Sequence, residues 1–392
     1  MLLLVTLAYI GLPVSALIDL PIHARQRPRD LKRSEPGPKS RFLYHHDGAY
    51  GVDVKIGQPP QTVELYIMTA DSKTWIANDY FLTNKSKSLS APKGQDIATY
   101  GDPTTYPPSN DTIHFDLYED KFEIADTKIC KQTFGVTDEY SDVGLLGLGP
   151  DLHRGYQPGS PYNTVLDSLA AQRAIPGRAF SVDLRPIEAN KGALTFGGAD
   201  TGRFEGKLVK RPLVKDELGT FGPSVVLSGY GQTAPNGTKF NYDVPKGDEV
   251  ITIDSGNQYF RFRHSIADPL FRDLGAVNDG NDAYYAPCSK RDEPGTWDFH
   301  FGEVTIKVPY KNFITEEKDD SGKNCFVGVL TTWKGQLRFG VIPESFMQAA
   351  YLSYDYDNKV VGMAPSADCK GKLVPFTSGP NAIPDLTGCK AK

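Results

Sequence analysis

Residues 50–75 read YGVDVKIGQPPQTVELYIMTADSKTW, and this stretch decides the fold. Apolar residues alternate with other residues over 50–56 and again over 63–67, as they do in half-buried strands. The Gly-Gln-Pro-Pro-Gln turn between these segments predicts a hairpin. Its second strand leads into a loop that starts at Met68 and reaches Trp75. We therefore expect a β-rich domain in which this hairpin presents a small-residue loop.

The composition predicts a mostly β protein with two lobes. A chain of 392 residues is too long for one compact core. Its 38 Gly, 29 Pro, 20 Tyr and 20 Phe favour short strands and tight turns over helices. The net charge of −5 and the lack of a basic stripe argue against nucleic acid as a partner. The histidines show no zinc-ligand spacing, so neither a metal nor another cofactor is expected.

The N-terminus predicts export. An apolar run over residues 2–12 precedes Val14-Ser15-Ala16, which is typical of a signal peptide (residues 1–16) cleaved after Ala16. The run is too short to span a bilayer, so we expect a secreted, extracellular protein with no membrane segment. Residues 17–44 are basic and contain prolines, which indicates a short propeptide or linker. Lys32-Arg33 is its candidate processing site, and an uncleaved disordered arm is the alternative.

An oxidising compartment implies that most of the five cysteines are paired. Cys288 and Cys325 flank a predicted hairpin and form one expected disulfide. Cys369 and Cys389 close a short loop in the tail, which leaves Cys130 as a buried thiol. Alternatively, Cys130 takes the place of one tail cysteine, and the sequence does not choose between these pairings. Three sequons predict surface glycosylation, at Asn84, Asn110 and Asn236.

Other elements are expected along the chain. Further strands are predicted over 113–122, 193–196, 207–213, 250–254, 296–308 and 351–361, the last with a turn at Asp357-Asn358. Three helices are predicted: one opened by Ser160-Pro161 with Val165, Leu166 and Leu169 on its apolar face, one near 268–274, and one from Pro343-Glu344 that includes Phe346, Met347 and Ala350.

A faint internal duplication links two loops. The Met68 loop is followed by GLLGLG at 144–149, and the loop at Asp254 is followed by FGVIP at 339–343. Each half thus has a strand that ends in a small-residue loop, and later a hydrophobic segment with small residues. Two similar lobes with one loop each are expected to face each other across a cleft.

Several motifs together carry a resemblance to the pepsin-like aspartic peptidases, over about residues 45–365. They are IGQPPQ (56–61), the 68–75 loop against D-T-G-S-S-x-x-W, Tyr100-Gly101-Asp102, GLLGLG (144–149), FSVDL (180–184), LTFGGAD (194–200), Asp254-Ser255-Gly256, and YDYDN (354–358) with VGMA (361–364). The chain resembles a fungal-type secreted member of this family with a degenerate active site.

The resemblance implies a mostly β, bilobal, pepsin-like double-ψ β-barrel fold with a central cleft. Its N-terminal lobe is expected over 45–205, its C-terminal lobe over 206–365, and a tail over 366–392. By the same resemblance, Tyr100 and Gly101 belong to a flap over the cleft. The residues expected to line the cleft beside the two motifs are Thr69, Ser255 and Gly256.

Departures from the family pattern concentrate where the chemistry belongs. Met68 stands where the resemblance places the first catalytic aspartate, whereas Asp254 retains the second. The other departures are Ala70 and Pro103 in place of glycines, Asn257 in place of Thr or Ser, and Pro343 in place of a glycine. Framework motifs are retained, so the fold is under stronger demand than catalysis.

The family's mechanism needs two carboxylates that share one proton, so that one activates water while the other protonates the scissile carbonyl. A thioether supplies neither group. We therefore expect a monomeric homologue that is catalytically inactive or strongly impaired and retains a cleft for a peptide or protein partner. The alternative is an active acid endopeptidase that uses Asp254 with a non-standard partner such as Asp71. A decoy for protease inhibitors is a further, minor alternative.

Overall fold

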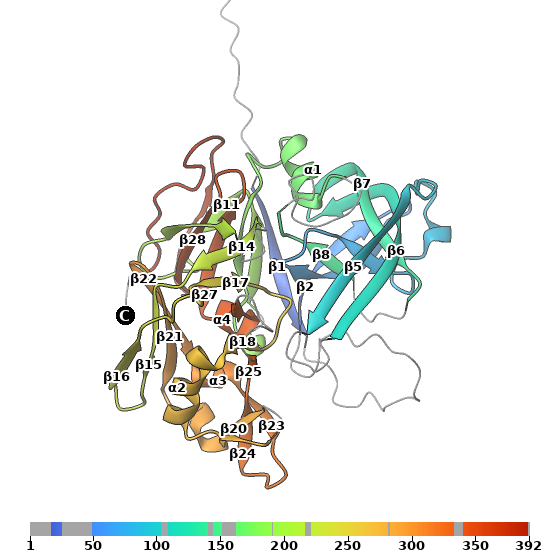
Figure 1. The fold of residues 1–392 in the computed structure, drawn as a ribbon. Helices are drawn as coiled ribbons and strands as arrows, with labels where there is room; N and C mark the ends of the chain where they lie inside the picture. Colours follow the sequence, from blue (N-terminus) through green and yellow to red (C-terminus); the bar gives the residue numbers. More distant parts are fainter. Residues whose placement is uncertain are drawn as a thin grey trace, which may run out of the picture.

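The fold is built on one large sheet that both halves of the chain share. The computed structural model describes residues 17–25, 49–102, 109–139, 144–150, 162–189, 191–215, 221–280, 283–332 and 340–390. In Figure 1 the N-terminal half (blue to teal) lies on one side and the yellow-to-red half on the other. The expected mostly β, bilobal architecture is confirmed.

The predicted hairpin forms as expected. Strand β2 (Ala49–Ile56) pairs antiparallel with β3 (Gln61–Met68), with Ile56 opposite Gln61. Val52, Val54, Val63 and Leu65 are buried, while intervening residues are more exposed. This period-2 pattern fixes the register, because a slip of one residue would turn the buried set toward solvent.

The described strands of the large sheet run through the centre of the molecule into the N-terminal half. Their order is β12 (Val209–Pro212), β28 (Val360–Pro365), β27 (Ala350–Asp355), β9 (Ala179–Asp183), β10 (Gly192–Phe196), β1 (Ile18–Arg25), β2, β3, β8 (Leu145–Gly147), β4 (Trp75–Ala77), β7 (Thr127–Thr137), β6 (Ser109–Ile124) and β5 (Gly94–Asp102).

Three smaller sheets make up most of the C-terminal half. The first has the order β13 (Val214–Lys215), β14 (Phe221–Val226), β17 (Val250–Ile253), β26 (Gly340–Ile342), β18 (Phe260–Arg263) and β25 (Val329–Thr332). The second contains β16 (Lys239–Tyr242), β15 (Gly229–Thr233), β21 (Thr296–Phe301) and β22 (Val304–Pro309). The third contains β19 (Val277–Asn278), β20 (Tyr284–Pro287), β24 (Asn324–Val327) and β23 (Ile314–Lys318).

Short elements complete the fold. A two-stranded sheet joins β11 (Gly198–Asp200) to β29 (Leu373–Pro375). The helices are α1 (Val165–Ala171), α2 (His264–Leu274), α3 (Tyr310–Phe313) and α4 (Glu344–Met347), with 3₁₀ turns η1 (Thr83–Lys85), η3 (Ile187–Ala189) and η4 (Cys288–Asp292). Within the ranges described above, no helix is long and apolar enough to cross a membrane.

The internal duplication is visible as one strand arrangement used twice. In the N-terminal half β3 runs parallel to β8 and β4 parallel to β7, while β4 and β8 meet antiparallel. In the C-terminal half β17 runs parallel to β26 and β18 parallel to β25, while β18 and β26 meet antiparallel. The 68–75 loop follows β3 and the Asp254 loop follows β17, so the two loops hold equivalent places.

Residues 17–44, predicted as a propeptide or linker, contain a strand of the central sheet. β1 pairs with β10 on one side and β2 on the other, and Ile18, Leu20 and Ile22 are buried. The described part of this segment therefore contributes to the core, which was not expected of a propeptide, a linker or a disordered arm. The predicted signal peptide and the Lys32-Arg33 site lie outside the described residues.

Helix α1 begins later than predicted. It starts at Val165 and not at Ser160-Pro161, which lie outside the described residues. Thr164 and Asp167 form a capping box: Thr164 Oγ1 accepts from the Asp167 N–H at 3.1 Å, and the Asp167 carboxylate accepts from the Thr164 N–H at 2.9 Å. This cap satisfies backbone donors of the first turn and fixes the start of the helix.

Helix α2 begins before the expected position, at His264, and contains Pro269 in its interior. Proline has no N–H, so the carbonyl of Ser265, four residues earlier, lacks its helical donor. The Tyr230 hydroxyl donates to that carbonyl at 3.2 Å. A tertiary contact thus supplies the donor that Pro269 lacks.

Two other boundaries were predicted wrongly. The single strand expected over 296–308 is a hairpin of β21 and β22, and Gly302 turns between them at a φ of +65°. Helix α4 ends at Met347, and Ala350, expected within it, begins β27. The strands expected over 113–122, 193–196, 207–213, 250–254 and 351–361 correspond to β6, β10, β12, β17 and the β27–β28 pair.

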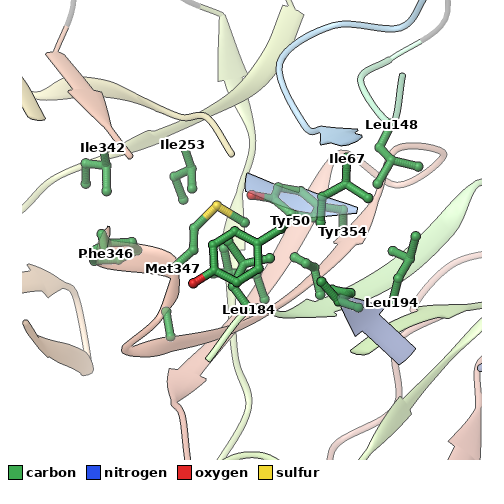
Figure 2. Packing of buried hydrophobic residues seen from close by; sticks show 14 of the residues in the cluster. Tyr50, Ile67, Leu148, Leu184, Leu194, Ile253, Ile342, Phe346, Met347 and Tyr354 are labelled. Atoms are coloured by element: carbon green, nitrogen blue, oxygen red, sulfur yellow. The ribbon is translucent and has the colours of Figure 1, made fainter. Parts of the chain in front are cut away.

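One hydrophobic core extends across both halves. Figure 2 shows Ile67 and Leu148 of the N-terminal half together with Ile253, Ile342, Phe346 and Met347 of the C-terminal half. Tyr50 and Tyr354 lie among them. The ends of β3 and β17 are therefore set on a shared, tightly packed base, which positions the two loops that follow them.

Candidate active site

Two loops meet where the halves of the molecule join, and four hydrogen bonds hold them together. The Thr69 N–H donates to Ser255 Oγ at 3.0 Å, and the Ser255 N–H donates to Thr69 Oγ1 at 3.0 Å. The Thr69 hydroxyl donates to the Ile253 carbonyl at 3.0 Å, and the Ser255 hydroxyl donates to the Ile67 carbonyl at 2.8 Å. Both hydroxyl residues are buried. Residues 68 and 254, which precede them, are therefore brought to the same junction.

Met68 fills the space between the loops with an apolar group. Its side chain is 4% exposed and belongs to a cluster with Trp75, Ala98 and Leu145. A Cβ atom placed on Gly256 would lie 2.1 Å from the Met68 Sδ atom. The thioether thus lies directly against the backbone of the opposite loop, beside Asp254.

Asp254 is the retained acid of the second loop, and the structure brings its carboxylate to this junction. Its Oδ1 accepts from the Gly256 N–H at 2.8 Å, and its Oδ2 accepts from Asn257 Nδ2 at 2.5 Å. Burial raises the pKa of Asp254, while the Gly256 and Asn257 bonds and the Arg261 charge oppose that rise. Burial is therefore the largest influence on the protonation of this acid.

Asn257 and Arg261 orient Asp254. Arg261 is 4% exposed, and its Nε donates to Asn257 Oδ1 at 3.0 Å. Because the amide oxygen accepts from Arg261, the amide nitrogen faces the Asp254 carboxylate. From the sequence, Asn257 was recognised only as a departure from the family pattern, and the role of Arg261 was not predicted. Its sole signal was a charged residue between Phe260 and Phe262, both fully buried in β18.

Comparison with known proteins places this chain in a family. The sequence model for eukaryotic aspartyl proteases matches residues 49–366. The chain belongs to this family. The protein named probable aspartic-type endopeptidase OPSB, from Arthroderma benhamiae, is 24% identical over 401 residues, which cover 94% of this chain and 78% of that protein. Secreted aspartic protease 6 of Candida albicans is 26% identical over 366 residues, covering 86% of this chain and 80% of that protein.

The fold comparison agrees with the family assignment. The crystal structure of the aspartic proteinase from Irpex lacteus matches with a TM-score of 0.68 and 19% identity, over 90% of this chain and 98% of that chain. At this identity the likeness shows the fold alone. The predicted family and the pepsin-like fold are thus confirmed, and the names of the relatives bear out the expected secretion.

The two half-sites of this aspartyl protease homologue are not equivalent. In the N-terminal half, a Cβ atom on Gly147 would lie 2.3 Å from the Ser72 carbonyl carbon, so glycine permits the 68–75 loop to pack closely. Met68 lies opposite Gly147, and Ile253 lies opposite Ile342, so Pro343 takes the place of Gly147 in the C-terminal half. The loop bonds shift accordingly. In the N-terminal half the donor is the N–H of Gly149, two residues after Gly147, which donates to the Asp71 carbonyl at 2.8 Å. In the C-terminal half the donor is the N–H of Glu344, one residue after Pro343, which donates to the Asn257 carbonyl at 3.0 Å.

Asp71, the candidate replacement acid, has its carboxylate engaged within its own loop. Its Oδ1 accepts from the Lys73 N–H at 2.9 Å, and the residue is 6% exposed. Asp71 raises the pKa of Tyr162. Asp71 therefore acts electrostatically on the Tyr162 side of the loop.

A buried ion pair joins the 68–75 loop to the expected flap hairpin. Lys73 Nζ donates to Asp96 Oδ1 at 3.0 Å, and the two side chains are 3% and 4% exposed. Lys73 Nζ also donates to the Ile97 carbonyl, and the Tyr162 hydroxyl donates to Asp96 Oδ2 at 3.4 Å. Sequence analysis missed this contact, because nothing in the linear pattern pairs residue 73 with residue 96.

The hairpin that carries Tyr100 and Gly101 is the one that packs on Met68. In the β5–β6 register, Tyr100 lies opposite Asp111 and Gly101 opposite Asn110. Ala98 and Ile113, paired further along these strands, belong to the Met68 cluster. The resemblance-based positions of Tyr100 and Gly101 near the site are thus compatible with the strand register. Pro103 lies outside the described residues.

The predicted disulfides form, and the tail pairing is settled. Cys288 and Cys325 are joined at an S–S distance of 2.01 Å, and Cys369 and Cys389 at 2.12 Å. Cys130 is a free thiol, but it is exposed and not buried as predicted. Its position in β7, near the turn to β6, explains the exposure.

The sequon residues lie in accessible parts of the fold where the structure describes them. Asn84 is exposed in η1, and Asn236 is exposed in the turn between β15 and β16. Asn110 lies in β6 opposite Gly101. Their glycosylation stays a prediction. Within the described ranges, no group of three or more His, Cys, Asp or Glu residues is placed to hold a metal ion.

Proposed function

We propose that this chain is a secreted aspartyl protease homologue that binds a peptide or protein segment between its lobes and has lost most or all hydrolytic activity. The observation that carries the proposal is Met68, whose thioether lies against Gly256 where the resemblance requires a carboxylate beside Asp254. The family assignment supports the peptide-binding part, and the retained Thr69–Ser255 bonds support an intact junction.

The loss of one acid removes a defined part of the chemistry. Peptide hydrolysis in this family needs one group to take a proton from water and another to give a proton to the carbonyl oxygen. Asp254 can perform one of these roles at a time, and Met68 can perform neither. Each assisted proton transfer contributes about 10²–10⁴-fold in rate, so we expect hydrolysis to be slower by about 10³-fold or more.

The alternative, an active acid endopeptidase, is favoured by the names of the relatives, which include a secreted aspartic protease and a probable aspartic-type endopeptidase. It requires a second acid close to Asp254. Asp71 is the acid nearest to Met68 in sequence, but its carboxylate accepts from the Lys73 N–H within its own loop. We therefore keep impaired catalysis as the proposal.

The binding part is tested with a fluorescently labelled peptide library and a statine-type inhibitor as competitor. We expect saturable binding by fluorescence anisotropy, displacement by the inhibitor, and intact peptides by mass spectrometry after binding. A folded protein, verified by circular dichroism, that shows no saturable binding would contradict the proposed ligand class. Product peptides that disappear in the Asp254→Asn variant would instead support the active alternative.

A further inference from the structure

The C-terminal segment 366–390, predicted as a tail, is part of the folded molecule. Its strand β29 pairs with β11, with Gly198 opposite Pro375 and Asp200 opposite Leu373. Further along, isolated β-bridges pair the backbone of Cys389 with that of Glu205, and the backbone of Thr387 with that of Lys207. In Figure 1 this dark red segment runs along β11 and β28. The segment is therefore held along much of its length to residues 198–207.

Residues 197–210 are the segment where the expected N-terminal lobe passes into the C-terminal lobe. The backbone of the 366–390 segment both accepts hydrogen bonds from this connection and donates hydrogen bonds to it. Leu208 donates to the Leu386 carbonyl at 3.0 Å and Gly206 to the Cys389 carbonyl at 2.9 Å. In return, Cys389 donates to the Phe204 carbonyl at 2.7 Å. These reciprocal bonds restrict the path of the connection between the halves.

The contact is close because glycines lie on both sides of it. A Cβ atom on Gly371 would lie 1.9 Å from the Gly202 nitrogen, and one on Gly388 would lie 2.2 Å from the Phe204 carbonyl oxygen. At these two positions any side chain would collide with backbone. The fit is therefore specific to this pairing of segments, and is closer than a loosely adsorbed tail would allow.

Apolar burial adds to the backbone contacts. Phe376, Ile383 and Leu386 are at most 8% exposed and form one cluster with Phe204 and Tyr351. Removal of the segment would expose these two aromatic side chains to water. The segment thus forms a smaller hydrophobic cluster, separate from the main core, that packs against the connection.

The segment also reaches each half directly. On the N-terminal side, the Ser366 hydroxyl donates to the buried Asp183 carboxylate at 3.0 Å. On the C-terminal side, Asn358 Nδ2 donates to the Gly379 carbonyl at 2.9 Å, and Lys210 forms an ion pair with Asp385 at 3.0 Å. One continuous stretch therefore touches both halves and the connection between them.

We propose that residues 366–390 act as a disulfide-closed clasp that fixes the connection and thereby the relative position of the two lobes. Both ends of the disulfide lie at Gly202, because the Cys369 N–H donates to its carbonyl at 2.9 Å and Cys389 Sγ lies 3.4 Å from it. Joining Cys369 to Cys389 keeps both ends of the clasp at the connection. This inference does not depend on peptide binding or on catalysis.

The test compares two double variants by amide hydrogen exchange. Cys369→Ser/Cys389→Ser opens the clasp, whereas Cys288→Ser/Cys325→Ser removes the other disulfide and serves as the matched control. If the clasp fixes the lobes, opening it accelerates exchange at Gly206 and Leu208 and also at Thr69 and Ser255, by about tenfold or more. The control leaves all four amides unchanged. Unchanged exchange at Thr69 and Ser255, or equal acceleration in the control, would contradict the proposal.

A second experiment avoids any failure of the variants to fold. A site-specific protease sequence is inserted in the exposed Ser378–Asn381 turn, and the chain is cut after folding. The new C-terminal fragment stays attached through the disulfide until a reductant is added. We expect reduction to release the fragment and to accelerate exchange at Thr69 and Ser255 more in the cut protein than in the reduced, uncut one, where the disulfide is open but the segment is still tethered. Retention of the fragment after reduction, or release without faster exchange, would contradict the role of the clasp.

Discussion

A thioether at position 68 changes both the packing and the electrostatics around Asp254. Met68 joins the apolar cluster of Trp75 and Leu145, so the substitution adds buried hydrophobic surface where a carboxylate would require hydration or hydrogen bonds. The loss was predictable from the sequence, because the hairpin before it and Trp75 after it fix the register. The orientation of Asp254 by Asn257 and Arg261 was not predictable from the sequence. It depends on how β18 places the side chain of Arg261, four residues after Asn257.

The Met68→Asp variant should recover part of the lost hydrolysis. A carboxylate at this position would lie across from Asp254 and could share its proton. We expect the rate of inhibitor-sensitive cleavage at pH 3–5 to rise by about 10²-fold or more over the unaltered chain. Met68→Asn is the matched control, since it has nearly the same shape and cannot ionise. Equal rates for the two variants would show that Pro343 or another departure also blocks the chemistry.

The pH dependence of Asp254 follows from its raised pKa. An acid whose pKa is raised by folding favours the folded state most at low pH, where it is protonated in both states. Its contribution falls as pH rises from the ordinary value through the raised one. Thus the Asp254→Asn variant should gain stability relative to the unaltered chain between pH 3 and pH 7. Urea unfolding at both pH values measures this, and a constant difference would contradict the assigned shift.

At the scale of elements, the placement of the flap hairpin depends on an ion pair that no local pattern indicated. Strands β2 and β3 were predictable because alternating apolar residues mark one buried face. Strands β10 and β17 are buried almost throughout and were predictable as short apolar runs. Lys73 and Asp96 gave no such signal, since charged residues usually face water. Their burial depends on tertiary packing around Tyr162 and the 68–75 loop.

Replacing Lys73 by Met should destabilise the protein strongly, because Asp96 would be left buried without its cation. Breaking a buried ion pair in this way typically reduces the free energy of unfolding by about 3–5 kcal/mol. Adding Asp96→Asn should restore part of the loss, because the amide still accepts from the Ile97 N–H. Urea unfolding provides the measurement.

The control for this prediction is Lys55→Met, which removes an exposed ion pair to Glu123. Little change in stability is expected there, because solvent screens such pairs. If Lys73→Met were as mild as Lys55→Met, the Lys73–Asp96 contact would not anchor the hairpin.

At the scale of the whole molecule, the two halves are joined by a shared core, a shared sheet and the Thr69–Ser255 bonds. The duplication was partly predictable, because a loop followed by a hydrophobic segment occurs twice in the sequence. The folding of 366–390 against the connection, and of β1 into the central sheet, was not predictable, since both depend on pairing between distant segments.

The Thr69→Val variant tests the bonds between the halves. Valine has nearly the shape of threonine but neither donates to the Ile253 carbonyl nor accepts from the Ser255 N–H. Each buried group left unpaired should reduce the free energy of unfolding by about 1–3 kcal/mol. Thr62→Val, at an exposed position on β3, is the control and should have little effect. Equal unfolding midpoints in urea would exclude a role for Thr69 in holding the halves together.

We propose that Asp254 beside Met68 does not support efficient hydrolysis, and a single rate measurement tests this. Purified, unaltered protein is incubated with a denatured protein substrate at pH 3–5, with and without a statine-type inhibitor, beside the Asp254→Asn variant. We expect the unaltered chain and the variant to release product peptides equally slowly, and the inhibitor to change neither rate. Rapid, inhibitor-sensitive cleavage that is lost in Asp254→Asn would contradict this expectation.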